Sequence, residues 1–274
     1  MTVVGISRSK QYSPGRESAD AVIFEKVSML LENQGVDVVR IPEEFVNSET
    51  FPTEIHIDAV FQMARSEDVQ NELSRLDIPI INSVSAVRNC GRTEQIKLLG
   101  NRPFLPASVC LETTNVVPAE WNIFPCWVKR GDSHSVGKDD VCLAQNSEEA
   151  SMIVAQMQER GIKNCILQKH VSGKLLKFYG VRGYGIVGSY YPTGADKFGN
   201  LQQCNDKIPD ADIERVSTIA EESAEMLETD VYGGDLIVTE EGTLYLVDFN
   251  DWPSFGCCQD KAAKVIAELI LNRI

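Results

Sequence analysis

The chain lacks several features that mark common classes of protein. Its 274 residues contain no Lys/Arg cluster, no internal repeat and no long uninterrupted apolar run. The formal net charge of −14 argues against non-specific nucleic-acid binding, and no segment is apolar enough to span a bilayer. The first residues, MTVVGIS, lack the basic segment of a signal peptide. We therefore expect a cytoplasmic protein without a nucleic-acid or membrane partner.

Metal-binding patterns of cysteine and histidine are also missing. The eight cysteines are scattered, and several lie in apolar runs such as FPCWV and NCILQ, which is typical of buried thiols in a reducing compartment. Cys257 and Cys258 are adjacent, but no second Cys/His pair follows at zinc spacing. His134 and His170 lack a third ligand. A thiolate or histidine zinc site is therefore not expected.

Alternating hydrophobic patterns predict an α/β protein. Up to residue 85, strands at 2–7, 36–42, 57–64 and 78–83 alternate with helices, the first at 17–34 with Gly35 as its stop, which indicates a parallel sheet. Two short helices around Gly91 and a proline-rich connector (101–108) come next. Strands then dominate, at 124–130, 141–144, 165–171, 174–183 and 184–192, with helices at 147–160, 210–229 and 259–273 and a hairpin at 233–249. We expect three segments, 1–85, 86–185 and 186–274.

The hairpin GGDLIVTEEGTLYLVDFN carries polar side chains on an otherwise apolar face. If Thr239 pairs with Leu244 across the turn, Asp235 lies opposite Asp248, and Asn250 shares the face of Asp248. Two carboxylates facing each other repel, and a divalent cation removes that repulsion. Asp and Asn oxygens suit Mg²⁺ or Mn²⁺, so this pattern predicts a metal site; a solvated outer face is the alternative.

A second set of residues suits a polyphosphate. The strand PCWVKR ends in Lys129, and the loop GDSHSVGKDD follows it. The loop differs from a Walker motif, since its spacing is one residue too long, Asp139 replaces Ser/Thr and a strand follows. We predict a short lid between antiparallel strands, whose amides bind phosphate. Lys177 and Arg182 are charges within an otherwise apolar strand region. Each is either a catalytic cation or an edge residue whose charged end reaches the solvent.

The order of these features resembles the ATP-grasp superfamily, in particular its RimK-like carboxylate–amine ligases, over about residues 78–256. The resemblance rests on Asn82-Ser83, Ala86, Cys90 and Arg92, then WVKR, ILQKHV, KFYGVRG, GGDLIV and LVDFNDWPSF. It implies an ATP-grasp fold with an N-terminal Rossmann-like domain, and ATP with Mg²⁺ (or Mn²⁺), two ions, as cofactors. The site residues it implies are Arg92, Lys129, Ser133, His134, Ser135, Gln168, Lys169, His170 and Val171 for ATP, Asp235, Asp248 and Asn250 for metal, and Lys177 and Arg182 for catalysis.

Several departures from the family pattern keep alternatives open. The second metal ligand is usually Glu rather than Asp248, and hinge position 169 is usually acidic. Residues 184–214 contain no Arg, although ligases usually supply one there. Three functions therefore remain: an ATP-dependent ligase that forms a C–N bond through an acyl phosphate, an inositol-phosphate-like small-molecule kinase of the same superfamily, and a nucleotide-binding module without catalysis.

The N-terminal segment is expected to supply much of the pocket for a small-molecule or peptide substrate. Arg16 follows the first strand, where open α/β sheets bind ligands, and would hold a carboxylate or phosphate; a solvated loop explains it equally well. Dimers are common in the family, so a homodimer is compatible with the resemblance.

Overall fold

The structure, a computed structural model, describes residues 1–47, 51, 55–132, 137–192 and 210–274. These residues form two compact units that interleave along the chain. Unit 1 comprises residues 1–87, 177–233 and 251–274, and unit 2 comprises residues 88–176 and 234–250. The division into three consecutive segments stays a prediction. Within the described residues, no helix combines the length and apolar character needed to cross a bilayer.

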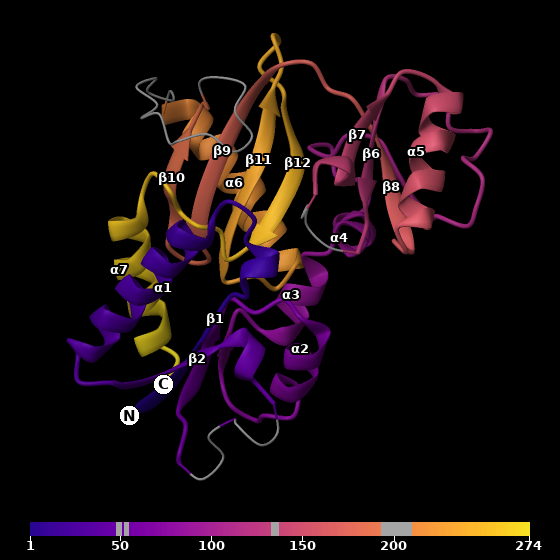
Figure 1. Ribbon diagram of the computed structural model, residues 1–274. Helices are drawn as coiled ribbons and strands as arrows, with labels where there is room; N and C mark the ends of the chain where they lie inside the picture. Colours follow the sequence, from indigo (N-terminus) through magenta and orange to yellow (C-terminus); the bar gives the residue numbers. More distant parts are fainter. Residues whose placement is uncertain (48–50, 52–54, 133–136, 193–209) are drawn as a thin grey trace. The chain divides into compact units, whose positions relative to one another are not determined.

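Unit 1 begins with the predicted parallel sheet, in the order β2-β1-β3-β4. Figure 1 labels its strands β1 and β2. All three neighbouring pairs are parallel, which confirms the prediction. The central strand is buried on both faces, with Val3, Val4 and Ile6 fully inaccessible, as a sheet covered by helices requires. The elements are β1 (Thr2–Ser7), α1 (Glu17–Glu32), β2 (Asp37–Pro42), β3 (Ala59–Gln62), α2 (Glu67–Leu73), β4 (Ile80–Ile81) and α3 (Val84–Asn89), with short 3₁₀ helices at Lys10–Tyr12 and Glu43–Phe45.

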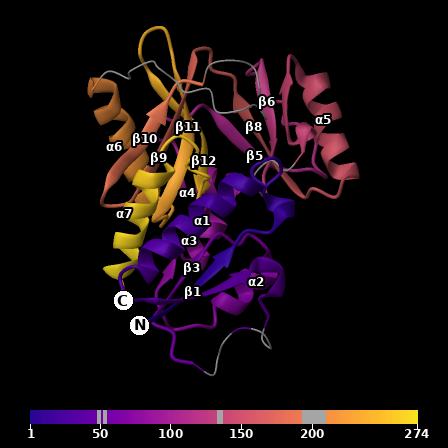
Figure 2. The same ribbon diagram turned by 60° about the vertical axis from the view of Figure 1, so that its left-hand side comes forward.

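The later elements of unit 1 pack against α1. Helices α1 and α7 (Gln259–Leu271) lie side by side in both ribbon views (Figures 1 and 2), and their apolar faces share one core with Trp252 and Phe255. A second sheet has the order β10-β9-β11-β12, and its middle strands run through both units. Its strands are β9 (Lys174–Val181), β10 (Gly185–Tyr190), β11 (Val231–Val238) and β12 (Leu244–Asp251), and α6 (Asp210–Met226) precedes β11.

Unit 2 contains an antiparallel sheet in the order β5-β8-β6-β7. Helix α5 lies against this sheet, beside the labelled strands β6, β7 and β8 (Figure 1). The Asn146 side chain accepts a hydrogen bond from Glu149 N and so caps α5, which buries Ala150, Val154 and Met157. The elements are α4 (Arg92–Leu99), β5 (Ser108–Glu112), β6 (Cys126–Arg130), β7 (Val141–Ala144), α5 (Ser147–Glu159) and β8 (Asn164–Lys169), with a 3₁₀ helix at Lys138–Asp140.

Strand β5 was not predicted from the sequence. This strand has five residues directly after the proline-rich connector, and Leu111 is the one buried residue in it. A short, half-buried strand has little periodic signal of its own. It exists because its backbone pairs along the whole length of β8, from Ser108 opposite Gln168 to Glu112 opposite Asn164.

Candidate nucleotide and metal site

Lys129 is the buried charge around which the candidate site in unit 2 is built. It lies in β6 with 6% of its surface exposed, and its Nζ donates to Gln168 Oε1 and to the Val247 carbonyl, each at 2.7 Å. Burial lowers the pKa of Lys129 to about 8, and the neighbouring charges of Asp248, Arg92 and Asp235 also act on it. Strand β6 therefore places a lysine where the charges of both predicted metal carboxylates, Asp235 and Asp248, act on it.

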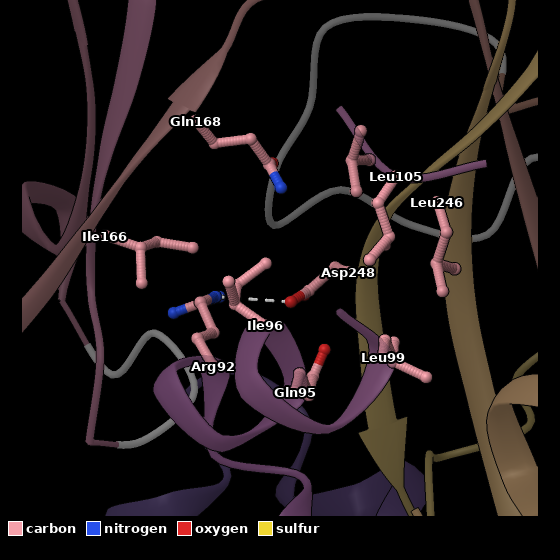
Figure 3. A pocket seen from close by; sticks show the side chains of 10 residues that line it. Arg92, Gln95, Ile96, Leu99, Leu105, Ile166, Gln168, Leu246 and Asp248 are labelled. Atoms are coloured by element: carbon pink, nitrogen blue, oxygen red, sulfur yellow. Dashed lines mark hydrogen bonds and ion pairs between the residues drawn. The ribbon is translucent and has the colours of Figure 1, made fainter. Parts of the chain in front are cut away.

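Arg92 brings a second cation to Asp248. It is the first residue of α4, after Gly91 as N-cap, and is 5% exposed. Its Nε lies 3.2 Å from Asp248 Oδ1, and its Nη1 donates to the Arg130 carbonyl at 3.3 Å. Figure 3 shows the guanidinium and the carboxylate pointing toward each other. Arg92, which was predicted to bind phosphate, thus forms an ion pair with Asp248, which was predicted to bind metal.

The predicted metal residues lie on β11 and β12. Asn250 Nδ2 donates to Asp248 Oδ2 at 3.3 Å, so the two side chains share a face of β12 as period-two counting predicts. Among the described residues, no group of three His, Cys, Asp or Glu side chains could hold a metal ion. The predicted set contains two carboxylates and one amide, and its oxygens fit the hard divalent ions Mg²⁺ and Mn²⁺.

The register of the hairpin differs from the assumed one at its turn. Thr239 N donates to Thr243 O at 2.9 Å, so Thr239 pairs with Thr243 and not with Leu244. The turn takes up one residue fewer than expected, with Gly242 in a left-handed conformation (φ +78°) that suits glycine. The direct opposition of Asp235 and Asp248 stays a prediction, and the charge of each acts on Lys129.

Unit 2 contains two cavities that share Leu105 in their walls, and Arg92 and Asp248 line the first of them. The first has a volume of about 10 Å³, which is about one water molecule. The ion pair of Arg92 with Asp248 lies in its wall (Figure 3). Around the pair are Gln95, Ile96, Leu99, Ile166, Gln168, Leu246 and Val247.

The second cavity, of about 590 Å³, lies along the segment that follows β8 and is in the size range of small-molecule sites. Three predicted nucleotide-binding residues, Lys169, His170 and Val171, line it. Trp127 Nε1 donates to His170 Nδ1 at 3.1 Å. Because Nδ1 accepts this bond, the neutral ring carries its proton on Nε2. The hydrogen bond from Trp127 thus fixes the orientation of the His170 ring in the wall of this cavity.

Two further features of unit 2, the hydrogen bonds of Gln95 and the close packing at Gly131, were not predicted from the sequence. Gln95 Nε2 donates to the carbonyls of Cys90 and Phe249, at 2.6 and 2.7 Å, and so ties α4 to β12. Gly131, directly after β6, approaches its surroundings so closely that a Cβ there would overlap the Thr93 hydroxyl. A glutamine on a short helix gives no sequence signal of such a contact. A glycine directly after a strand does indicate a close approach of the backbone to its neighbours.

The two predicted catalytic cations, Lys177 and Arg182, belong to unit 1. Lys177 lies in β9 opposite Tyr190. Arg182 Nη2 lies 2.6 Å from Asp230 Oδ1, and Arg273 approaches the same oxygen at 3.1 Å. Arg182 is thus held in a structural ion pair, and the catalytic roles of both residues stay predictions.

Other predicted residues have less structural context. Arg16 is exposed at the N-cap of α1. Ser133, His134 and Ser135 of the predicted lid lie outside the described residues, although β6 and β7 on either side of the lid are antiparallel as expected.

Asn82 has a structural role within unit 1. Its side chain accepts hydrogen bonds from Asp230 N and Val231 N, at 2.9 and 2.7 Å, and donates to the Val231 carbonyl at 2.7 Å. The residue after β4 therefore fixes the beginning of β11, which leads to Asp235. The sequence marks this residue only as part of the resemblance.

Solved structures share this fold over the whole chain. D-alanine–D-alanine ligase from Bacillus anthracis complexed with ATP matches with a TM-score of 0.75 at 15% identity, over 99% of this chain and 98% of that one. D-alanyl-alanine synthetase A from Vibrio cholerae gives 0.71 at 14% identity, over 100% and 98%. A RimK domain ATP-grasp protein from Sphaerobacter thermophilus gives 0.67 at 16% identity, over 99% and 100%. No protein-family model matches the sequence, and no curated protein matches it significantly. The chain has the ATP-grasp fold that the resemblance implied.

Proposed function

We propose that this chain is an ATP-dependent carboxylate–amine ligase that acts on a small molecule or peptide. The observation that carries the proposal is the buried Lys129, on which the charges of Arg92, Asp235 and Asp248 all act, in a chain with the ATP-grasp fold. Arg92 and Asp248 line one cavity, and that cavity shares Leu105 with a larger one. The structurally similar proteins include two named for joining alanine units, one of them complexed with ATP.

In this proposal the chain's residues bind and orient ATP. The 590 Å³ cavity beside Lys169, His170 and Val171 receives the base, and Lys129 and Arg92 bind the phosphates. Asp235, Asp248 and Asn250 would hold Mg²⁺, which neutralises charge on the transferred phosphoryl group. Arg92 must leave Asp248 as the phosphates enter, because the first cavity holds only about one water.

The proposed reaction has two steps. A substrate carboxylate oxygen attacks the γ-phosphorus, so that an acyl phosphate forms and ADP leaves. An amine then attacks the acyl carbon, phosphate leaves and an amide forms. Lys177 and Arg182 are proposed to stabilise the charge that develops in these steps, and Arg16 to hold an anionic group of the substrate.

Transfer of the γ-phosphoryl group to an alcohol is the second candidate. It is favoured by the absence of Arg from residues 184–214, where ligases usually supply one, while Lys177 is retained. Such a kinase would use the same nucleotide and metal residues, so the acceptor decides between the two functions.

Trapping with hydroxylamine tests the proposal. The protein is incubated with ATP, Mg²⁺, hydroxylamine and pools of small carboxylic acids, and both ADP and hydroxamate are measured. A ligase forms hydroxamate with one of the pools. A kinase forms ADP with a pool of alcohols, with a stable phosphate ester and no hydroxamate. Thermal stabilisation by ATP without any ADP would mean a binding module and would contradict both candidates.

Two variants test the metal residues. Asp248→Asn and Asn250→Ala should abolish Mg²⁺-dependent turnover and leave the circular dichroism spectrum unchanged. Glu148→Gln is the matched control, since Glu148 is an exposed acid on α5 of the same unit. Unchanged turnover in Asp248→Asn would remove the metal assignment.

A further inference from the structure

Cys257 and Cys258 form a pair of adjacent thiols over a glycine of unit 1. A Cβ atom on Gly188 of β10 would lie 2.5 Å from Cys258 Sγ and 3.5 Å from Cys257 Sγ. Both sulfur atoms therefore turn toward one point above the strand, and the missing side chain of Gly188 makes room for them. The two thiols also share a hydrogen bond.

The turn before the pair holds this arrangement. Phe255 is fully buried and has a left-handed backbone (φ 51°), and its carbonyl accepts a hydrogen bond from Cys258 N at 2.8 Å. Cys258 is the N-cap of α7, and its carbonyl accepts from Ala262 N at 2.9 Å. Residues on both sides of the pair are thus fixed, so the two sulfur atoms stay close together.

The two thiols differ in accessibility and acidity. Cys257 is exposed, whereas Cys258 is half-buried against the apolar core of unit 1. The hydrogen bond from the Cys258 thiol lowers the pKa of Cys257, and the same bond and burial raise the pKa of Cys258. Thiolate character and exposure both favour oxidation. Cys257 therefore has the properties of an attacking thiol and Cys258 those of a resolving one.

We propose that Cys257 and Cys258 are a peroxide-sensitive dithiol that closes to a disulfide between adjacent residues. The Cys257 thiolate attacks one oxygen of hydrogen peroxide, so that an S–O bond forms, the O–O bond breaks and hydroxide leaves. The Cys258 sulfur then attacks the sulfenic sulfur, the S–S bond forms and the S–O bond breaks. The Cys258 proton leaves with that oxygen as water. Two thiols are oxidised, and one peroxide is reduced to two waters.

The product is expected to be reduced easily. Neighbouring Cα atoms are about 3.8 Å apart, below the range of about 4.4–6.8 Å usual for disulfides, so the ring is strained. Strained disulfides have higher reduction potentials and are the labile ones. The modification is therefore expected to be reversible.

Peptide mapping of the full-length protein tests this proposal. The protein is treated with peroxide, quenched in acid, alkylated with iodoacetamide under denaturing conditions and digested with trypsin. The peptide 216–261 contains no cysteine other than these two. We expect it to lose two hydrogen atoms, to carry no alkyl group and to regain two alkyl groups after brief treatment with dithiothreitol.

Variants make the result specific. Cys257→Ser should abolish the two-hydrogen loss, and Gly188→Ala should slow it severalfold, because the added Cβ would displace the Cys258 sulfur. Cys142→Ser is the control, since Cys142 is a half-buried thiol of unit 2, and this variant should behave as wild type. Sulfinic or sulfonic acid at Cys257 with Cys258 still alkylated would overturn the proposal. So would a disulfide from either residue to a different cysteine.

Discussion

Replacing Lys129 by Met should change how stability depends on pH. The ammonium group is buried and lies between Gln168, the Val247 carbonyl and the charge of Asp248. In the proposed function Lys129 binds phosphate, whereas the nucleotide-free protein must bury its charge. Stability and the proposed function therefore oppose each other at this residue.

The magnitude follows from the pKa of Lys129. Folding lowers it from 10.5 to about 8, which corresponds to about 3 kcal/mol against the folded state at neutral pH. Below pH 8 the lysine is protonated in both states, so its contribution does not vary with pH. Between about pH 8 and 10.5 the unfolded chain binds more protons than the folded one, so the free energy of unfolding rises with pH. By pH 9.5 the wild type should gain about 2 kcal/mol from this residue.

Met cannot titrate, so Lys129→Met should lack this gain. At pH 7 its net effect is small, because removing the buried charge is offset by two acceptors left without a donor, at about 1–3 kcal/mol each. The difference in stability between wild type and variant should grow by about 2 kcal/mol from pH 7 to 9.5.

Urea unfolding followed by tryptophan fluorescence measures this difference, since Trp121 and Trp127 belong to the same unit as Lys129. Lys97→Met is the control, because Lys97 is exposed and its pKa is raised by Glu94, so it does not titrate in this range. A difference between wild type and Lys129→Met that stays constant from pH 7 to 9.5 would refute the reasoning.

Three further predictions concern packing and charge. Gly131→Ala should lower the free energy of unfolding by about 1–3 kcal/mol in the same urea titration, because its Cβ would overlap the Thr93 hydroxyl. Gly137→Ala is the control and should be nearly neutral, because its Cβ would meet nothing closer than 3.7 Å. Asn82→Ala should lower it by about 3 kcal/mol or more, since three buried backbone groups lose their partner, and a loss below 1 kcal/mol in that assay would contradict this. Arg92→Gln should bind Mn²⁺ roughly tenfold more tightly without nucleotide, because it removes a cation 3.2 Å from Asp248; equal Mn²⁺ affinity by electron paramagnetic resonance would speak against it.

Local patterns predicted most of the fold. The parallel sheet of residues 1–85, the two helices around Gly91 and the hairpin of β11 and β12 are present as predicted. Each has a hydrophobic period or a turn signal several residues long. Strand β5 was missed because five half-buried residues carry no such signal, and the turn of the hairpin differs by one residue because register depends on the turn geometry.

The candidate site was predicted as a set of residues without their contacts. That Lys129, Asp248 and Arg92 belong to it followed from charges at the ends of apolar strands and from the resemblance. The ion pair of Arg92 with Asp248 joins residues 156 positions apart, so no local pattern contains it. The same holds for the hydrogen bond by which Trp127 orients His170.

The sequence by itself determined where most strands and helices form and which side chains could bind a nucleotide and a metal, because periodicity and side-chain chemistry are local properties. The tertiary structure alone decided which charges meet. Packing buries Lys129 and so lowers its pKa, and it pairs Arg92 with Asp248. It also brings the thiols of Cys257 and Cys258 close to Gly188. Burial and distances between residues far apart in the chain exist only once the elements are packed.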